Sequence, residues 1–246
     1  MKVITSNNNQ ELGNAAGKAA ATLIRETIKE KGSANIILAT GTSQFETIRQ
    51  LLEEEGIDWS KVTMFHLDEY IGLPITHPAS FRKYLQERFI NKVPALKAAH
   101  LINGEADPEE ERKRVGKLIS DYPIDVALVG IGENGHLAFN DPPADFDTKE
   151  PYLVVNLDTA CRQQQMNEGW FGSLEEVPAQ AISMSVHQIM LSKHIICSVP
   201  GVRKAQAVKD SLEREVSNRY PASILQTHAD CVFYLDADSA AKLAHA

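Results

Sequence analysis

The segment "IDVALVGIGENGHLAFND", residues 124–141, carries a short apolar run straight into a glycine-rich loop that contains a histidine and an acid. An apolar run of this length is typical of a buried strand, and the glycines that follow it favour a tight turn. The loop also has the G-x-G-x-x-G spacing of dinucleotide-binding sites. It therefore has two interpretations, a cofactor site or a turn that presents His136.

A dinucleotide site requires a helix that begins at the glycines and receives the pyrophosphate at its N-terminus. The sequence continues instead with "HLAFNDPPADF", residues 136–146, which has two prolines and no helical periodicity. Asp158 follows the apolar "YLVVNL" and could stand in for the ribose-binding acid, but the missing helix counts more. We therefore expect no dinucleotide here.

Strand-like and helical stretches alternate along the whole chain. We expect strands within residues 34–40, 62–70, 124–132 and 194–201, and helices within residues 44–56, 80–90, 107–122 and 203–213. Strands followed by helices imply parallel pairing through right-handed crossovers. The predicted fold is α/β, an open doubly wound, mainly parallel sheet with helices on both faces (Rossmann-like), in a single domain over residues 1–246.

The composition excludes several partners. The 246 residues carry a net charge of -8 and show no concentrated basic face, which argues against nucleic acid and anionic membranes. The first residues lack an apolar leader and no long apolar run follows, so we expect a cytoplasmic protein. Three widely spaced cysteines without a C-x-x-C pattern argue against a disulfide framework or a zinc site, and Cys197 and Cys231 fit a core.

The loops after the strands are where an open α/β sheet binds its ligand. In the first quoted loop, His136 can exchange a proton near neutral pH, Asp141 can orient its ring, and Asn134 can hold a hydroxyl. A polar loop histidine without chemistry is the simpler interpretation of this loop taken alone.

A second loop, "FHLDEYIGLP" at residues 65–74, favours the catalytic interpretation over the non-catalytic one. Asp68 and Glu69 are adjacent at a strand end, so they face opposite sides and cannot form a simple pair. One partly desolvated carboxylate at this edge suits moving a proton between neighbouring carbons. A strand that ends in solvated charges is the alternative.

Two further loops look suited to an anion. In "ATGTSQ", residues 39–44, small and hydroxyl residues lead into a helix, which fits a phosphate monoester; an ordinary helix cap by Thr42 or Ser43 is an equal alternative. "PGVRKAQAV", residues 200–208, repeats the arrangement and adds Arg203 and Lys204, unless these simply begin a solvated helix.

Taken together, the four loops resemble the glucosamine-6-phosphate deaminase (isomerase) family, within the wider group that includes 6-phosphogluconolactonases. The specific motifs are "LDEY-GLP--HP-S" at residues 67–80 and "NGH-AFN" at residues 134–140. The resemblance runs in order over nearly the whole chain. It implies conversion of glucosamine 6-phosphate and water to fructose 6-phosphate and ammonia, with no metal or organic cofactor.

The resemblance also implies a role for each site residue. His136, helped by Asn134 and Asp141, would open the sugar ring, and Asp68 would carry a proton from C2 to C1. The phosphate cradle would be formed by Thr40, Gly41, Thr42, Ser43 and Lys204. The expected partner is a small sugar phosphate, and homo-oligomer formation is left open.

Some residues depart from the family pattern. Many deaminases carry Glu where this chain has Asp141, and the segment "CRQQQMNEGWF" at residues 161–171 keeps Arg162 but loses a second arginine. Three alternatives therefore remain: a deaminase for another amino-sugar phosphate such as galactosamine 6-phosphate, a 6-phosphogluconolactonase, and a sugar-phosphate-binding regulator without catalysis.

Overall fold

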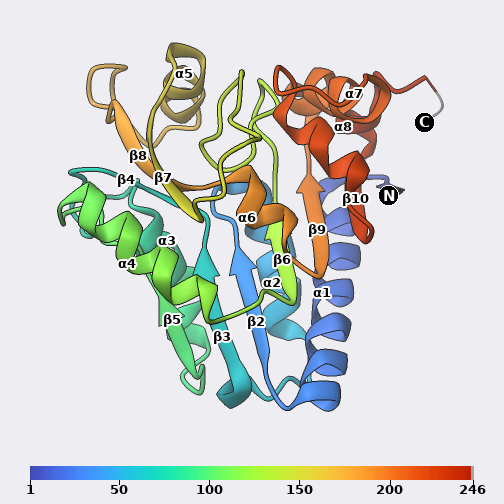
Figure 1. The fold of residues 1–246 in the computed structure, drawn as a ribbon. Helices are drawn as coiled ribbons and strands as arrows, with labels where there is room; N and C mark the ends of the chain where they lie inside the picture. Colours follow the sequence, from blue (N-terminus) through green and yellow to red (C-terminus); the bar gives the residue numbers. More distant parts are fainter. Residues whose placement is uncertain (245–246) are drawn as a thin grey trace.

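The computed structural model describes residues 1–244, and its centre is a sheet of seven parallel strands. The strands point the same way, so their carboxyl ends meet at one edge, at the top of Figure 1. In spatial order they are β1 (Lys2–Ser6), β10 (Cys231–Asp236), β9 (His194–Val199), β6 (Val126–Val129), β2 (Ala34–Leu38), β3 (Val62–His66) and β5 (Ala98–His100).

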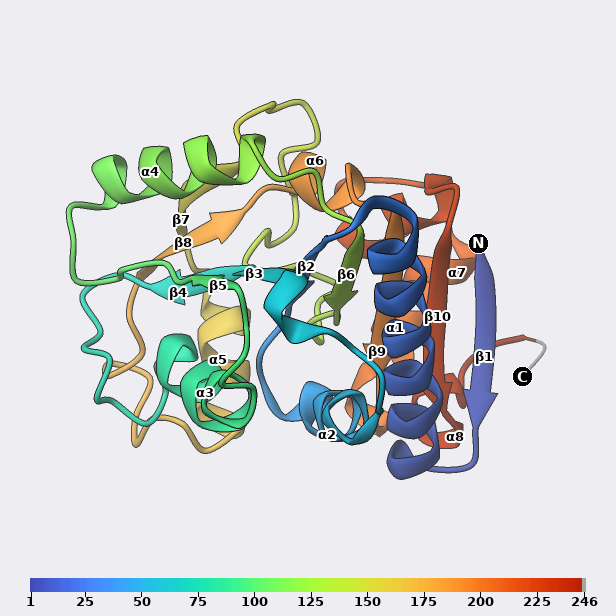
Figure 2. The same cartoon turned by 90° about the horizontal axis from the view of Figure 1, so that it is seen from below.

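Helices cover both faces of this sheet, as Figure 2 shows along the strands. Successive strand residues explain this, because Ile36 belongs to a hydrophobic cluster on one face of the sheet and Ile37 belongs to a cluster on the other face. The helices are α1 (Asn9–Lys31), α2 (Phe45–Glu53), α3 (Phe81–Arg88), α4 (Pro108–Ser120), α5 (Thr159–Asn167), α6 (Val186–Met190), α7 (Ala205–Glu213) and α8 (Ala237–Ala240). The predicted α/β class with a parallel sheet and helices on both faces is confirmed.

Local sequence fixes where the helices begin and end. The side chain of Asn8 accepts a hydrogen bond from Glu11 N at the start of α1, and Gly32 ends the helix with a φ of 82°. Asp107 caps α4 in the same way and is followed by Pro108, whose fixed φ suits the first helical position. These ends direct the chain back across the sheet at each crossover.

The strand order reverses between β2 and β6. From β2 the chain moves outward through β3 to β5, and it then returns to the other side of β2 with β6 and moves outward through β9 to β10. A ligand site is expected in the crevice at such a reversal, outside the carboxyl ends of the strands. The loops after β3, β2, β6 and β9, which are neighbours in the sheet, meet there.

A second sheet differs from what the sequence predicts. The run at residues 62–70 looks like one strand, but the chain leaves the parallel sheet at Leu67 and continues as β4 (Asp68–Tyr70). There it pairs antiparallel with β8 (Gln180–Met184), which also pairs with β7 (Tyr152–Asn156). Leu67 O accepts a hydrogen bond from Met184 N, at 2.6 Å. The second sheet thus fixes the backbone immediately before Asp68.

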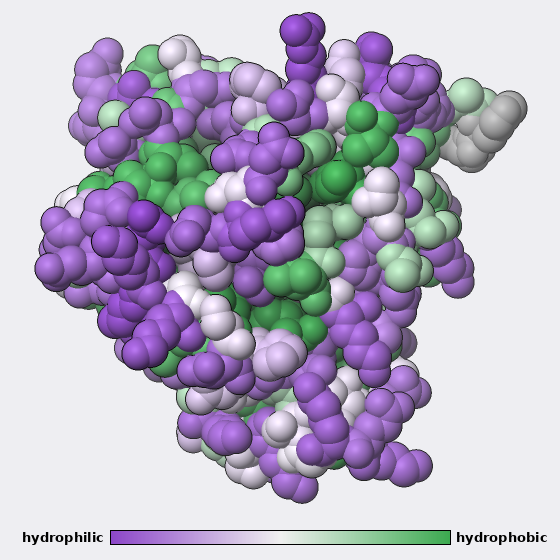
Figure 3. Space-filling view, viewed as in Figure 1, coloured by the Kyte–Doolittle hydropathy of each residue, from purple (hydrophilic) through white to green (hydrophobic). Residues whose placement is uncertain are grey.

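The outer surface of the molecule is hydrophilic where α4 faces solvent. Figure 3 shows hydrophilic side chains over the outer face of α4, whose Val115 and Ile119 are buried below.

In residues 1–244 no helix is long and apolar enough to cross a membrane. Cys197 and Cys231 are free and buried in the core, as expected. Residues 141–151 form an irregular loop, so no helix follows the glycines.

Candidate active site

A cavity of about 560 Å³ lies at the carboxyl ends of β3, β2, β6 and β9. The structure brings the predicted residues of all four loops to it, since Asp68, His136 and Lys204 line one space together with residues 40–43. Asn134 and Asp141 lie just behind the lining and contact His136 from there. Every predicted site residue is therefore in the lining or one contact behind it.

The glycine loop holds His136 in one orientation. Its Nδ1 lies 3.0 Å from an oxygen of Asp141, and that same oxygen accepts a hydrogen bond from the Asn134 amide at 3.0 Å. The Asn134 side-chain oxygen in turn accepts from the backbone N–H of His136 at 3.1 Å. The shorter Asp141 therefore reaches the imidazole directly and needs no bridging water.

Asp141 is prepared to carry negative charge. Burial opposes its ionisation, but hydrogen bonds from His136 and Asn134 and from the backbone N–H of Asp158 outweigh burial and lower its pKa. An ionised Asp141 stabilises a protonated imidazole, so His136 can hold a proton and then donate it. Asp158 itself caps α5 by accepting from Cys161 N.

Asp68 and Glu69 point to opposite sides, as the alternation of a strand predicts. Asp68 lines the cavity and is 7% exposed, and burial, followed by the charge of Glu69, raises its pKa to about 8. Glu69 is fully buried on the other side, where its carboxylate accepts from Ser80 Oγ at 2.8 Å and Arg82 N at 2.9 Å at the start of α3. Glu69 thus anchors a helix, and Asp68 is left free for chemistry.

The two remaining loops have the same backbone design. Gly41 and Gly201 both have a φ of 94° and each precedes one turn of 3₁₀ helix, at Thr42–Gln44 and Val202–Lys204, that leads into α2 and α7. Neither Thr42 nor Ser43 caps the helix with its side chain. The helix-cap alternative is therefore not what the structure shows, and the hydroxyls and free N–H groups remain available to an anion.

Lys204 lines the cavity together with residues 40–43, and we call these five residues the candidate anion-binding corner. Burial lowers its pKa, while Glu168 and Glu133 oppose that effect from a distance. No carboxylate within residues 1–244 forms an ion pair with its ammonium group. A partly buried cation that lacks an ion pair is well placed to bind a phosphate.

Helix α5 contributes residues that the sequence did not single out. Gln164, Gln165 and Glu168 line the cavity, and Gln164 joins α5 to the glycine loop by accepting from Glu133 N at 2.9 Å. Arg162, at the family's first arginine position, instead donates to the carbonyls of Leu174 and Val177. The guanidinium of Arg162 is therefore hydrogen-bonded within residues 162–177. Only the run of three glutamines at residues 163–165 hinted that this helix presents polar groups to a ligand.

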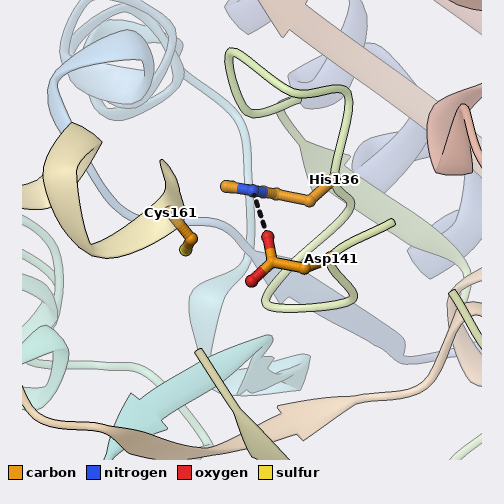
Figure 4. Close-up of side chains that lie close together, drawn as sticks. All are labelled: His136, Asp141 and Cys161. Carbon is orange, nitrogen blue, oxygen red and sulfur yellow. Dashed lines mark hydrogen bonds and ion pairs between the residues drawn. The ribbon is translucent and has the colours of Figure 1, made fainter. Parts of the chain in front are cut away.

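Cys161 is the second unexpected residue. Figure 4 shows it on α5 beside His136 and Asp141, which come from the glycine loop. Its side chain is 1% exposed, and burial, with a further contribution from Asp141, raises the pKa of its thiol well above the usual range. Imidazole, carboxylate and thiol thus meet in one place.

Comparison with known proteins places this geometry in a family. A family model described as glucosamine-6-phosphate isomerases/6-phosphogluconolactonase matches residues 7–234. The chain belongs to this family. Within the isomerase/lactonase family, a glucosamine-6-phosphate deaminase of Streptococcus sanguinis is 37% identical over 246 residues, the full length of both chains.

Solved structures of the family agree with the fold. A monomeric glucosamine-6-phosphate deaminase superposes with a TM-score of 0.88 at 34% identity, covering 98% of this chain and 99% of the other. A 6-phosphogluconolactonase of Shewanella baltica OS155 superposes with a TM-score of 0.80 at 20% identity, covering 96% and 97%. At that identity the lactonase shows a shared fold only. The resemblance inferred from the four loops is thus confirmed at the level of the family.

Proposed function

We propose that this protein is a glucosamine-6-phosphate deaminase of amino-sugar catabolism, which converts glucosamine 6-phosphate and water to fructose 6-phosphate and ammonia. The observation that carries the proposal is that Asp68 and the His136–Asp141 pair open into the same cavity as the anion-binding corner. The deaminase relatives and the carboxylate-bearing loop at residues 67–80 support it.

Binding of the substrate phosphate would be the most important contact, because it fixes the position of the sugar relative to the two proton-transfer groups. Backbone N–H groups and hydroxyls of residues 40–43 would donate to its oxygens, and Lys204 would balance its charge. The sugar ring then extends toward Asp68 and His136, at the other loops of the same cavity.

Ring opening would use His136. The imidazolium donates a proton to the ring oxygen as the bond between C1 and that oxygen breaks, and the C1 hydroxyl gives its proton to a water molecule, which leaves the open-chain aldehyde. The ionised Asp141 stabilises the imidazolium before this step, and Asn134 holds Asp141 in place. These two residues act through His136 and position it.

Isomerisation and deamination would use Asp68. Its carboxylate removes the proton from C2, forms an enolamine, and returns a proton to C1, so that C2 becomes an imine carbon. Water adds at C2 and ammonia leaves, which gives the ketose. The raised pKa of Asp68 makes it a stronger base than a solvated carboxylate, and the substrate ammonium group would favour its ionised form.

One observation favours a second substrate in the same class. The α5 side of the cavity presents Gln164, Gln165 and Glu168, while Arg162 is bound to backbone carbonyls. Amide and carboxylate groups can form hydrogen bonds with sugar hydroxyls. Galactosamine 6-phosphate differs from glucosamine 6-phosphate in the orientation of one hydroxyl. A deaminase that acts on galactosamine 6-phosphate is therefore the second candidate.

The test is a parallel assay of glucosamine 6-phosphate, galactosamine 6-phosphate and 6-phosphogluconolactone. We expect ammonia and a ketose 6-phosphate in equal amounts from the first substrate. Release of ammonia from galactosamine 6-phosphate alone would mean that this sugar is the substrate. Lactone hydrolysis without ammonia from either amino sugar would overturn the deaminase assignment.

Two further properties stay predictions. We propose a cytoplasmic location, which the three free cysteines support because reduced thiols are usual in that compartment. Formation of a homo-oligomer is also untested, and the mass of the purified protein in solution would decide it. The solved deaminase relative is described as monomeric.

A further inference from the structure

The cluster of His136, Asp141 and Cys161 has a chemistry that the proposed reaction does not use. One ligand atom from each side chain, a ring nitrogen, a carboxylate oxygen and the sulfur, lie within 4.8 Å of one another. Figure 4 shows the three side chains grouped between α5 and the glycine loop. The deaminase mechanism requires the imidazole and the carboxylate, but it gives the thiol no role.

These three atoms match the ligands that zinc prefers. Nitrogen, oxygen and sulfur ligands bind Zn²⁺ at about 2.0 to 2.3 Å, which places neighbouring ligands of a tetrahedral ion about 3.5 Å apart. The His136 Nδ1 and the Asp141 oxygen, 3.0 Å apart, would move slightly apart, and the most widely separated pair of ligand atoms, within 4.8 Å, would close by roughly 1 Å to reach that spacing. Rotation about side-chain bonds can supply such a movement, and the cavity beside His136 leaves room for a water as the fourth ligand.

Charge also favours a divalent cation. A carboxylate from Asp141 and a thiolate from Cys161 would together carry two negative charges, which balance one divalent cation. The S–H bond of Cys161 breaks, a Zn–S bond forms and the proton passes to solvent, so no electron transfer is involved.

We propose that His136, Asp141 and Cys161 form an inhibitory binding site for a thiophilic divalent cation such as Zn²⁺. The bound ion would occupy the ring nitrogen or the carboxylate oxygen that His136 and Asp141 otherwise use for proton transfer. Binding of the ion does not depend on the proposed function, whereas inhibition rests on it. The spacing of the cysteines argues against a zinc site, because the three ligands do not follow a short zinc-binding pattern and come together only in the folded chain.

Two readouts test the proposal on the full-length protein. Equilibrium dialysis with Zn²⁺ measures binding, and Co²⁺ in place of Zn²⁺ gives a charge-transfer absorption band only when a thiolate is a ligand. The deaminase assay then measures inhibition and its reversal by a chelator. We expect one tightly bound Zn²⁺ per chain, a thiolate–cobalt band, and loss of activity that the chelator restores.

Matched variants identify the ligands. Cys161→Ala should weaken zinc binding and inhibition by about tenfold or more and abolish the cobalt band. Cys197→Ala removes a buried thiol elsewhere, and His194→Ala removes the ring that contacts Asp230; both should leave inhibition unchanged. Each variant is compared with its own rate without zinc.

Equal zinc inhibition of Cys161→Ala and the unaltered protein, or no cobalt band in the unaltered protein, would overturn the site. If the protein releases no ammonia at all, dialysis and the cobalt band still decide whether the cation binds. Failure of the metal site is thereby distinguished from failure of the proposed function.

Discussion

The imidazole of His136 lies against the α-carbon of Gly132, so closely that a β-carbon on Gly132 would overlap three atoms of the ring. The backbone N–H of Gly132 also donates to the carbonyl of His136 at 2.9 Å. Gly132 therefore makes space for the side chain of His136. This explains why the spacing of a dinucleotide site occurs here without the helix that a dinucleotide requires.

Gly132→Ala tests this contact. Gly132 does not have a positive φ, so alanine is acceptable to the backbone and the expected defect comes from displacement of the ring. A displacement of about 1 Å should lower kcat about 100-fold. Gly116→Ala is the matched control, since its new methyl group would meet Pro151 at an ordinary 3.8 Å. Full activity of Gly132→Ala would show that the ring position does not matter.

Asp141→Asn tests the ionised partner of His136. The substitution keeps the size of the side chain but removes the charge that stabilises the imidazolium, so kcat should fall about 100-fold or more. The exposed Asp147→Asn, in the same irregular loop, should have little effect. Stopped assays of both variants at saturating substrate give the comparison. Equal rates for the two variants would show that catalysis does not require the charge of Asp141.

Lys204→Met tests the phosphate corner. Methionine keeps the apolar stem and removes the ammonium group that lacks an ion pair, so KM should rise about 100-fold with a smaller change in kcat. Lys209→Met is the control, because Lys209 pairs with Glu213 on the outer side of α7. Inhibition by inorganic phosphate should weaken together with substrate binding. A variant with unchanged KM would place the phosphate elsewhere.

The raised pKa of Asp68 has a consequence for stability. Its usual value is 3.8 and its value in the folded protein is about 8, so folding favours the protonated form. The stability that this group contributes is complete below pH 4 and is lost as the pH rises to 8, by up to about 1.4 kcal/mol per pH unit. Asp68→Asn cannot ionise, so its melting temperature should exceed that of the unaltered protein by a margin that widens between pH 4 and 8. Thermal unfolding at several pH values measures the margin. A constant margin would mean that Asp68 has an ordinary pKa.

Much of the fold and the site follows from local sequence. The apolar runs that become β2, β6 and β9 are continuous because both faces of those strands are covered, and that pattern is readable without a structure. The opposite directions of Asp68 and Glu69 follow from alternation along a strand. The meeting of four loops follows from the parallel arrangement, which places all carboxyl strand ends at one edge.

The rest depends on contacts between distant residues. The bend at Leu67 occurs because β4 pairs with β8, more than a hundred residues later in the chain, and no local signal marks that register. The position of α5 is set by the hydrogen bond between Gln164 and the glycine loop. Sequence could therefore not place Cys161 beside His136, nor show that Arg162 would be bound to its own segment.

The most direct test of the central claim, that Asp68 transfers the proton between C2 and C1, is the activity of Asp68→Asn with glucosamine 6-phosphate. We expect that release of ammonia and fructose 6-phosphate falls by about 1,000-fold or more, while the affinity for a non-reacting sugar phosphate stays close to that of the unaltered protein. Calorimetric titration with that ligand shows that the variant is folded and binds. An Asp68→Asn protein that still releases both products at a comparable rate would contradict the assignment.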